Sequence, residues 1–284
     1  MPPRVGYPVM TEPSAYSDPV RNVPVRRVGP PRPGEADAGD GSRDAVVVEH
    51  RVRIVLNARP LLWINCLPEA LEYLAAGFLV SEGLIEGADA ISEITVAPDL
   101  SRVEVRGTVD PDRLVVFRER LSITSGCGGG ASAAEEALPP CESDVRFSPD
   151  DLTDRIREMA AASTLFRDTG GVHVAAVTDG PDLSSFAEDI GRHNAVDKAV
   201  GLCLMHGISL AERAILTTGR ASADILAKAA RAGLPVVVSR GAVTSRAIDL
   251  ARAGNVTVVG FARRGRMNVY TAPWRLGLEG DEAE

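Results

Sequence analysis

The spacing of hydrophobic and polar residues predicts a first folded part over residues 45–120. It begins with the alternating run AVVVEHRVRIVL, which is typical of a β-strand, and the turn NARP at 57–60 leads to a second apolar run, LLWINC. Leu71, Leu74 and Phe78 then recur at helical spacing. Two short strand patterns, ISEITVAP and SRVEVRG, follow. The pattern indicates a hairpin, a helix and further strands, and hence a small α+β domain.

Helical and strand patterns alternate over residues 146–284. The sequence SPDD at 148–151 predicts a helix that continues to about residue 163, and VHVAAVTD and SSFAEDI predict paired strands around a turn at 179–182. Helix-and-strand units come next, with the strand patterns RAILTTG, PVVVSRG and VTVVGFAR, and MNVYT predicts a last strand. Such alternation is typical of an α/β fold, in which helices cover a sheet with parallel strands.

Two other stretches lack these patterns. Residues 1–44 contain nine of the nineteen prolines, together with glycine, serine and charges of both signs, which predicts a disordered tail. Both Met1 and Met10 are candidate start residues. Residues 121–145 contain a glycine-rich segment around Cys127, which we interpret as a loop and linker between the two folded parts.

The composition narrows the class of function. The formal net charge is −8 and aromatic residues are 4% of the chain, so neither nucleic acid nor an anionic membrane is an expected partner. No apolar run reaches the ~20 residues of a membrane span, and no signal peptide pattern is present. Four scattered cysteines are no disulfide framework and suit a reducing compartment, so we expect a cytoplasmic protein.

The first candidate site is the segment TSGCGGGAS, in which three glycines follow Cys127. Glycine leaves the sulfur uncrowded, and a thiolate in such a loop can react with two different partners in turn. The alternative is an incidental cysteine in a surface loop. The same segment also fits the dinucleotide-binding pattern G-x-G-x-x-A over residues 126–131. That pattern needs an acidic residue at the end of a strand ~20 residues further on, and here this distance falls in CESD, just after two prolines, which indicates a loop. A dinucleotide-binding oxidoreductase is therefore a weaker alternative.

A second candidate site is the set of turns between a strand and the following helix. EDIGRHNAVDK at 188–198 contains Arg192, and later turns contain Arg220 and Arg240. Because the carboxyl ends of parallel strands share one edge, these arginines are expected to face one crevice, to which FARRGR at 261–266 adds three more. Arginine binds phosphate oxygens well, which favours a phosphate-rich small molecule. The alternative is that Asp189 and Asn194 merely cap and turn the chain.

A metal site is not expected. The four histidines, His50, His173, His193 and His206, have no partner at i+3 or i+4, and no C-x-x-C occurs. The sequence PCESD at 140–144 lacks the second cysteine of the P-C-x-x-C motif that binds zinc in zinc deaminases. His173 is interpreted either as a structural histidine or as a ligand contact.

Several segments together resemble the FdhD family, the formate dehydrogenase accessory sulfurtransferases. They are LPEALEYLAAGFLVSEGLI, SGCGGGAS, FRDTGGVHVAAV, EDIGRHNAVDK, TTGRASADILAKAARAGLPVVVS and VGFARRGRMNVYT, in the order of the family and over residues 49–276. The resemblance implies a three-layer α/β C-terminal domain similar to cytidine deaminases but without their zinc site. Homodimer formation is also expected.

The resemblance also implies a function. A sulfur carrier of this kind takes sulfur from a cysteine desulfurase as a persulfide and passes it to the bis-guanine-dinucleotide molybdenum cofactor, with either molybdenum or tungsten as the metal, before the cofactor enters formate dehydrogenase. Cys127 aligns with the persulfide cysteine. The cofactor-binding segment aligns with Phe261, Ala262, Arg263, Arg264, Gly265 and Arg266, and we expect His193 and Arg220 to assist.

The sequence departs from the family pattern at two positions. Gly130 stands where the family loop commonly has a second cysteine, and Val243 replaces a common proline. One thiolate is enough for persulfide transfer, so sulfur transfer remains the leading prediction. The alternative is a chaperone that binds the molybdenum cofactor without transferring sulfur.

Overall fold

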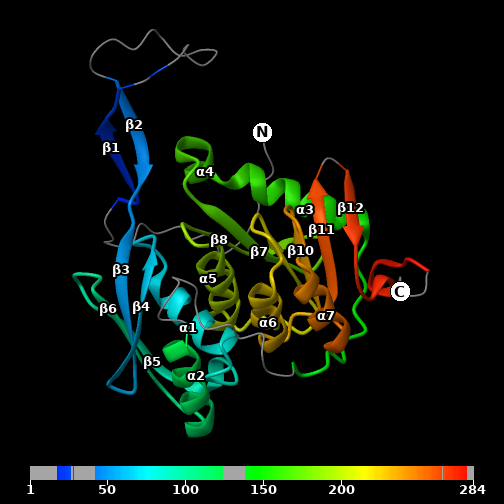
Figure 1. Ribbon diagram of the computed structural model, residues 1–284, viewed down its shortest axis with the longest axis horizontal. Coiled ribbons are helices and arrows are strands. Elements are labelled where there is room, and N and C mark those ends of the chain that lie inside the picture. Colours follow the sequence, from blue (N-terminus) through cyan, green and yellow to red (C-terminus); the bar gives the residue numbers. More distant parts are fainter. Residues whose placement is uncertain (1–17, 27, 29–41, 124–137, 264, 280–284) are drawn as a thin grey trace.

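The structure is a computed structural model and describes residues 18–26, 28, 42–123, 138–263 and 265–279. These residues form two α/β parts that pack against each other, an N-terminal part on the left of Figure 1 and a C-terminal part on the right. The mixed α/β class is confirmed. The relation to cytidine deaminases stays a prediction.

The N-terminal part is built on a four-stranded sheet in the order β4-β3-β6-β5. Its elements are β3 (His50–Leu56), β4 (Arg59–Cys66), α1 (Leu71–Ser81), the 3-10 turn η1 (Ala88–Ala90), β5 (Ile91–Val96), β6 (Arg102–Gly107) and α2 (Pro111–Ile123). Antiparallel pairing of β3 and β4 confirms the predicted hairpin. Alternate residues such as Val52 and Ile54 are fully buried in one core with Leu71 and Leu74 of α1, because the strand period of two places them on one face.

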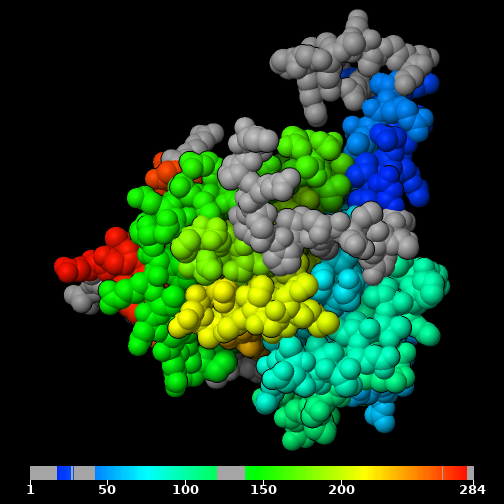
Figure 2. Space-filling model, turned by 180° about the vertical axis from the view of Figure 1, so that it is seen from behind, coloured from blue at the N-terminus to red at the C-terminus, as the bar shows by residue number. Residues whose placement is uncertain are grey.

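A short ribbon precedes this sheet, and it corrects two predictions. Strand β1 (Val20–Pro24) pairs antiparallel with β2 (Arg43–Val47), so the prediction of a disordered tail is wrong for Val20–Pro24. Each strand of a two-stranded ribbon uses the N–H groups on only one of its sides. A proline, which has no N–H, is therefore tolerated where it faces away from the partner strand. The expected single strand over residues 45–56 is also wrong, because it divides into β2 and β3. Figures 1 and 2 both show the ribbon projecting from the body.

The C-terminal part is built on a six-stranded sheet in the order β12-β11-β10-β9-β7-β8. The strands are β7 (His173–Thr178), β8 (Leu183–Asp189), β9 (Ala214–Thr217), β10 (Val236–Ser239), β11 (Thr257–Arg263) and β12 (Arg266–Val269). Strands β9, β10 and β11 are parallel as predicted, and β7 runs antiparallel to both β8 and β9. The sheet is therefore mixed.

Helices cover both faces of this sheet. They are α3 (Pro149–Ala162), α4 (Thr164–Thr169), α5 (Arg192–Met205), α6 (Ala223–Arg231) and α7 (Ser245–Ala253), and the 3-10 turn η3 (Pro273–Leu276) lies near the end. One core joins α5, α6 and α7 to the sheet, and a second joins α3 to its other face, which makes three layers. Ser148 caps α3 by accepting a hydrogen bond from the Asp151 N–H, as the SPDD sequence predicts. Helix α4 was not predicted.

The two parts meet where α1 crosses α5. Gly77 of α1 and Gly201 of α5 lie at the crossing, and a Cβ atom on either would approach a backbone oxygen of the other helix to within 1.8 to 1.9 Å. The helices can pack this closely only because both residues are glycine. In Figure 2 the cyan N-terminal part directly adjoins the yellow segment that follows α5. Among the described residues no helix is long and apolar enough to cross a membrane.

Candidate functional site

The candidate site lies at one edge of the six-stranded sheet. Strands β8, β9, β10 and β11 end there, and β7 begins there, because β7 is antiparallel to its neighbours. Short hydrogen bonds hold the connecting turns: Ser239 Oγ donates to the Gly219 carbonyl over 2.6 Å and accepts from the Gly241 N–H over 2.9 Å. The turns after β9 and β10 are thus fixed to each other.

A pocket of about 510 Å³ opens at this edge. Its lining residues are Ala160, Ser163, Phe166, Gly170, Gly171, Val172, His173, Val174, Ile190, Thr218, Arg240, Gly241 and Arg263. Two arginines therefore line the same pocket, Arg240 directly after β10 and Arg263 at the end of β11. Thr218 and His173 supply further polar groups, whereas the Ser163 hydroxyl donates a hydrogen bond to the Glu188 carboxylate and accepts one from the Phe166 N–H. Such a donor set suits an anionic ligand.

The surroundings of His173, at the start of β7, favour its neutral form. Its Nδ1 lies 3.4 Å from Thr218 Oγ1, and the same hydroxyl oxygen accepts a 2.9 Å hydrogen bond from the Val174 N–H. Burial, and then the charge of Arg192, lowers the pKa of His173. A neutral imidazole next to two arginines can donate or accept one hydrogen bond without adding charge.

Phe261 of β11, two residues before the pocket residue Arg263, has a strained backbone conformation. Phe261 has φ +52°, a left-handed conformation that non-glycine residues rarely adopt, and the register between β11 and β12 shifts between Gly260 and Arg263. The Phe261 N–H donates to the Gly241 carbonyl over 2.8 Å, which holds the bulge in place. The bulge redirects the end of β11, and Arg263 there lies 5.8 Å from the Phe261 ring centroid. Strain of this kind is found at binding sites.

The structure brings together only some of the residues predicted for the site. Of the predicted segment 261–266, Arg263 lines the pocket, whereas Phe261, Ala262, Gly265 and Arg266 do not. Arg220 is exposed outside the lining. Cys127 and Arg264 lie outside the described residues.

Neither Arg192 nor His193 lines the pocket. Arg192 packs over Gly219, where a Cβ atom would lie 2.8 Å from Arg192 Cβ. Burial, and then the charges of Lys228 and Arg192, lowers the pKa of His193 to about 4. Its Nε2 is buried and has no hydrogen-bond partner among the described residues. His193 is therefore neutral at pH 7.

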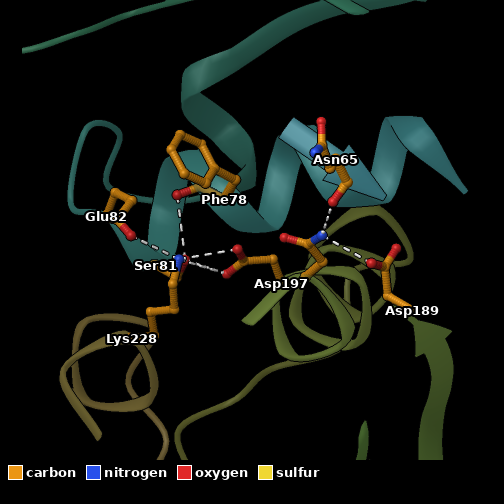
Figure 3. Close-up of polar contacts among 8 residues, drawn as sticks. Asn65, Phe78, Ser81, Glu82, Asp189, Asp197 and Lys228 are labelled. Carbon is orange, nitrogen blue, oxygen red and sulfur yellow. Dashed lines mark hydrogen bonds and ion pairs between the residues drawn. The ribbon is translucent and has the colours of Figure 1, made fainter. Parts of the chain in front are cut away.

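Three charged or polar residues of EDIGRHNAVDK join the two parts of the protein. Lys198 Nζ lies 2.6 Å from Asp189 Oδ2, and both side chains are fully buried. Asp189 also accepts hydrogen bonds from the Leu67 N–H over 3.1 Å and from Asn194 Nδ2 over 2.8 Å, and Asn194 Nδ2 donates to the Asn65 carbonyl (Figure 3). Asp189 Oδ1 also accepts a hydrogen bond from the Gly191 N–H, so Asp189 turns the chain as the alternative interpretation expects, but the N-cap of α5 is Gly191 and no side chain caps the helix. The contacts of Asp189 and Asn194 also reach across the junction.

A second buried cluster lies at the same junction. Lys228 Nζ is 2.8 Å from Glu82 Oε1 and 3.0 Å from both carboxylate oxygens of Asp197, and it donates to Ser81 Oγ over 3.0 Å (Figure 3). Burial raises the pKa of Asp197 to about 6, although Lys228 opposes the shift. Burial alone would lower the pKa of Lys228, but Asp197 and Glu82 outweigh it, so that pKa lies above its ordinary value.

Sequence reasoning missed the part of the pocket that comes from α4. Ser163, Phe166 and Gly171 belong to FRDTGG and the residues before it, where no helix was expected. The signals are present in the sequence: Ser163 accepts a hydrogen bond from the Phe166 N–H as a helix cap, and Gly170 ends the helix in a left-handed conformation. Among the described residues no group of three or more His, Cys, Asp or Glu side chains is placed to hold a metal.

The fold and the pocket define a class: a mixed α/β protein in two parts, with a basic pocket at the carboxyl edge of its larger sheet. The sequence profile of the FdhD/NarQ family matches residues 47–277, and the chain belongs to this family. It is 37% identical over 243 residues to the sulfur carrier protein FdhD of Bacillus subtilis (strain 168), which covers 82% of this chain and 90% of that protein.

Two further relatives agree. The sulfur carrier protein FdhD of Methanothermobacter thermautotrophicus is 36% identical over 234 residues, which is 82% of this chain and 92% of that protein. A crystal structure from Desulfotalea psychrophila, assigned as a formate dehydrogenase accessory protein, superposes with a TM-score of 0.69 at 30% identity and covers 90% of this chain and 98% of that one. The chain is thus a member of a family of sulfur carrier proteins.

Proposed function

We propose that this chain is a cytoplasmic sulfurtransferase required for formate dehydrogenase activity. It accepts sulfur from a cysteine desulfurase as a persulfide on Cys127 and passes it to the bis-guanine-dinucleotide molybdenum cofactor before the cofactor enters formate dehydrogenase. The pocket that Arg240 and Arg263 reach together carries the proposal, because it suits the phosphate groups of this cofactor, in a family whose relatives are named sulfur carriers.

The first step is thiolate attack. Cys127 thiolate attacks the terminal sulfur of the persulfide on the desulfurase, the bond between the two donor sulfurs breaks, and the donor cysteine leaves as a thiolate. Cys127 then carries the persulfide. On delivery, Cys127 is released as a thiolate and the transferred sulfur, formally neutral, becomes sulfide, so the acceptor metal centre supplies two electrons.

The cofactor, as cargo, is expected to place a phosphate group between Arg240 and Arg263, with a hydroxyl contact from Thr218. The neutral His173 imidazole can contact the same ligand without repelling either arginine. Arg264 and Arg266 stay in the proposal on the family resemblance alone, because Arg264 lies outside the described residues and Arg266 does not line the pocket. His193 and Arg220 act indirectly in this arrangement, since neither lines the pocket.

The test compares wild type with the Cys127→Ala variant. After incubation with a purified cysteine desulfurase and free cysteine, wild type is expected to gain one reducible sulfur atom by intact-protein mass spectrometry, and the variant none. Both proteins should bind the cofactor equally. Arg263→Gln is expected to weaken cofactor binding by ~10-fold or more, the loss of one charge-assisted hydrogen bond, and Arg157→Gln on α3 is the matched control.

The two outcomes separate the candidate functions. Failure of wild type to gain sulfur, with a desulfurase that loads a known carrier, would refute sulfur transfer and favour the cofactor-binding chaperone that Gly130 suggests. Unchanged cofactor affinity in Arg263→Gln would refute the pocket for both functions.

A further inference from the structure

One face of the N-terminal sheet carries no helix from the part of the chain that the structure describes. In the described part of the chain α1 and α2 pack on the other face, where Val52, Ile54, Val103 and Val105 are buried. The uncovered face of β3, β4 and β6 displays Arg51, Arg53, Trp63 and Arg102. We call these four residues the Trp63 patch.

The patch has an unusual arrangement of side chains. Trp63 is 45% exposed, and the guanidinium carbons of Arg51 and Arg53 lie 4.9 and 5.0 Å from its ring centroid. Arg53 stands opposite Trp63 on β4 and opposite Arg102 on β6. Like charges in register on neighbouring strands reduce stability, so folding alone gives no reason for this pairing.

The arginines of the patch differ in their acidic partners. Hydrogen bonds from Ser101 and, to a smaller extent, the charge of Arg102 lower the pKa of Asp99. Neither Arg51 nor Arg53 forms an ion pair with a carboxylate among the described residues, whereas Arg106 on the same sheet pairs with Glu93 over 3.0 Å. The stacked guanidinium groups are held in place by Trp63, so little side-chain entropy is lost when they bind. In a chain of net charge −8 the patch is thus a local cluster of positive charge around one large apolar side chain.

This composition fits a protein partner. Tryptophan and arginine are the residues most enriched among those that dominate protein interfaces, and a ring surrounded by guanidinium groups matches an apolar pocket with an acidic rim. The patch is also connected to the C-terminal part, because the Asn65 carbonyl, two residues after Trp63 on β4, accepts a hydrogen bond from Asn194.

We infer that the Trp63 patch is the docking surface for the sulfur-donor protein, which would present an acidic surface to it. This inference rests on the proposed function. None of the residues that line the pocket comes from the N-terminal sheet, so a donor on the patch leaves the pocket open to the cofactor and to the protein that receives it.

The experiment measures binding of the full-length chain to a purified cysteine desulfurase from the same organism by isothermal titration calorimetry at low and high salt. Arg51→Glu/Arg53→Glu is expected to weaken binding by at least about tenfold, ~1.4 kcal/mol, and Trp63→Ala by a similar factor. Arg157→Glu, a charge reversal at a residue of α3 with 74% side-chain exposure, is the control and should bind like wild type. Wild-type binding should weaken as salt increases.

Several results would overturn the inference. They are absence of wild-type binding, equal binding by the patch variants, and patch-dependent binding that is seen only with formate dehydrogenase, with phosphatidylglycerol vesicles or with a second copy of the chain. Circular dichroism checks that Trp63→Ala is folded, and the double arginine variant tests the inference independently of that residue.

Sulfur loading of Cys127 separates this inference from the proposed function. If wild type gains sulfur while the patch variants bind the desulfurase normally, the Trp63 patch is not the docking surface, and the proposed function is retained. If binding depends on the patch while Cys127 gains no sulfur, the proposed sulfur transfer is refuted, and the Trp63 patch is retained as the docking surface.

Discussion

His193 illustrates how a single residue differs from what its sequence context predicts. Its position in EDIGRHNAVDK favoured a ligand contact, but the imidazole does not line the pocket, and burial with the charges of Lys228 and Arg192 lowers its pKa to about 4. An unfolded chain takes up a proton at this residue below pH ~6.5, whereas the folded chain does not. The neutral imidazole therefore stabilises the fold above that pH, and the contribution is lost as the pH falls toward 4.

We expect His193→Asn to make the stability less sensitive to acid. Between pH 7 and pH 4 wild type should lose ~3 kcal/mol more free energy of unfolding than the variant, from 1.4 kcal/mol per unit of pKa shift. Asp197, whose raised pKa acts in the opposite direction, is present in both proteins and largely cancels. Urea unfolding at a series of pH values measures the difference, and parallel pH profiles would show that His193 does not titrate in this way.

At the scale of elements, the crossing of α1 and α5 depends on two glycines. Glycine inside a helix normally reduces stability by ~1 kcal/mol relative to alanine. Gly77 and Gly201 are kept against that preference because Asp197 and Tyr73 carbonyls occupy the space that a Cβ would need. The close approach in turn brings Ser81 and Glu82 at the end of α1 to Lys228.

Gly77→Ala is expected to destabilise the protein by ~3 kcal/mol or more, although alanine is the better helix former, because a Cβ at 1.8 Å from the Asp197 oxygen forces the helices apart. Gly201→Ala should have a similar effect. Gly87→Ala is the matched control, since nothing lies within 4 Å of its Cβ position. Thermal and urea unfolding measure the changes, and a stabilised Gly77→Ala variant would mean that the helices do not pack this closely.

For the whole molecule, two buried ionic clusters connect the N- and C-terminal parts. Asp189 and Lys198 bind the backbone around Leu67, and Lys228 lies between residues of α1 and α5. Buried ion pairs contribute little compared with apolar residues, but loss of one partner is costly because the other remains buried without its counter-ion. These clusters therefore favour one relative placement of the two parts over others.

Lys198→Met is expected to destabilise the protein by ~3–5 kcal/mol, because it leaves the Asp189 carboxylate buried and unpaired. Asp189→Asn/Lys198→Met should recover much of that loss. Calorimetry and urea unfolding measure both, and wild type should unfold in one transition since the clusters join the two parts. A single variant as stable as wild type, or a double variant no better than the single one, would contradict the role of this pair.

Local patterns predicted much of the fold. The β3–β4 hairpin, the capped helix α3 and the parallel strands β9, β10 and β11 all follow from periodicity, turns and caps, which depend on residues close in sequence. Strand β1 and helix α4 were missed because the first pairs with β2 across a proline-rich stretch and the second is only six residues long. Both lack a periodic pattern of sufficient length.

The candidate site was predicted in outline only. Parallel strands place Arg240 and Arg263 at one edge, as the order of elements implies, but the sequence favoured His193, whereas the structure places His173 in the pocket lining. His173 reaches this edge because β7 runs antiparallel to β9, a pairing that local patterns do not specify.

The sequence by itself determined the α/β class, the family and the edge of the sheet where basic residues gather, and it predicted Cys127 as the cysteine to test, because each follows from residues near one another in the chain. Only the tertiary structure decided which charged groups are buried partners and which are free for a ligand. Asp189 meets the Leu67 N–H across 122 positions, and Lys228 reaches Ser81 across 147. Contacts over such separations arise from the packing of whole elements, and no local pattern of residue types records them.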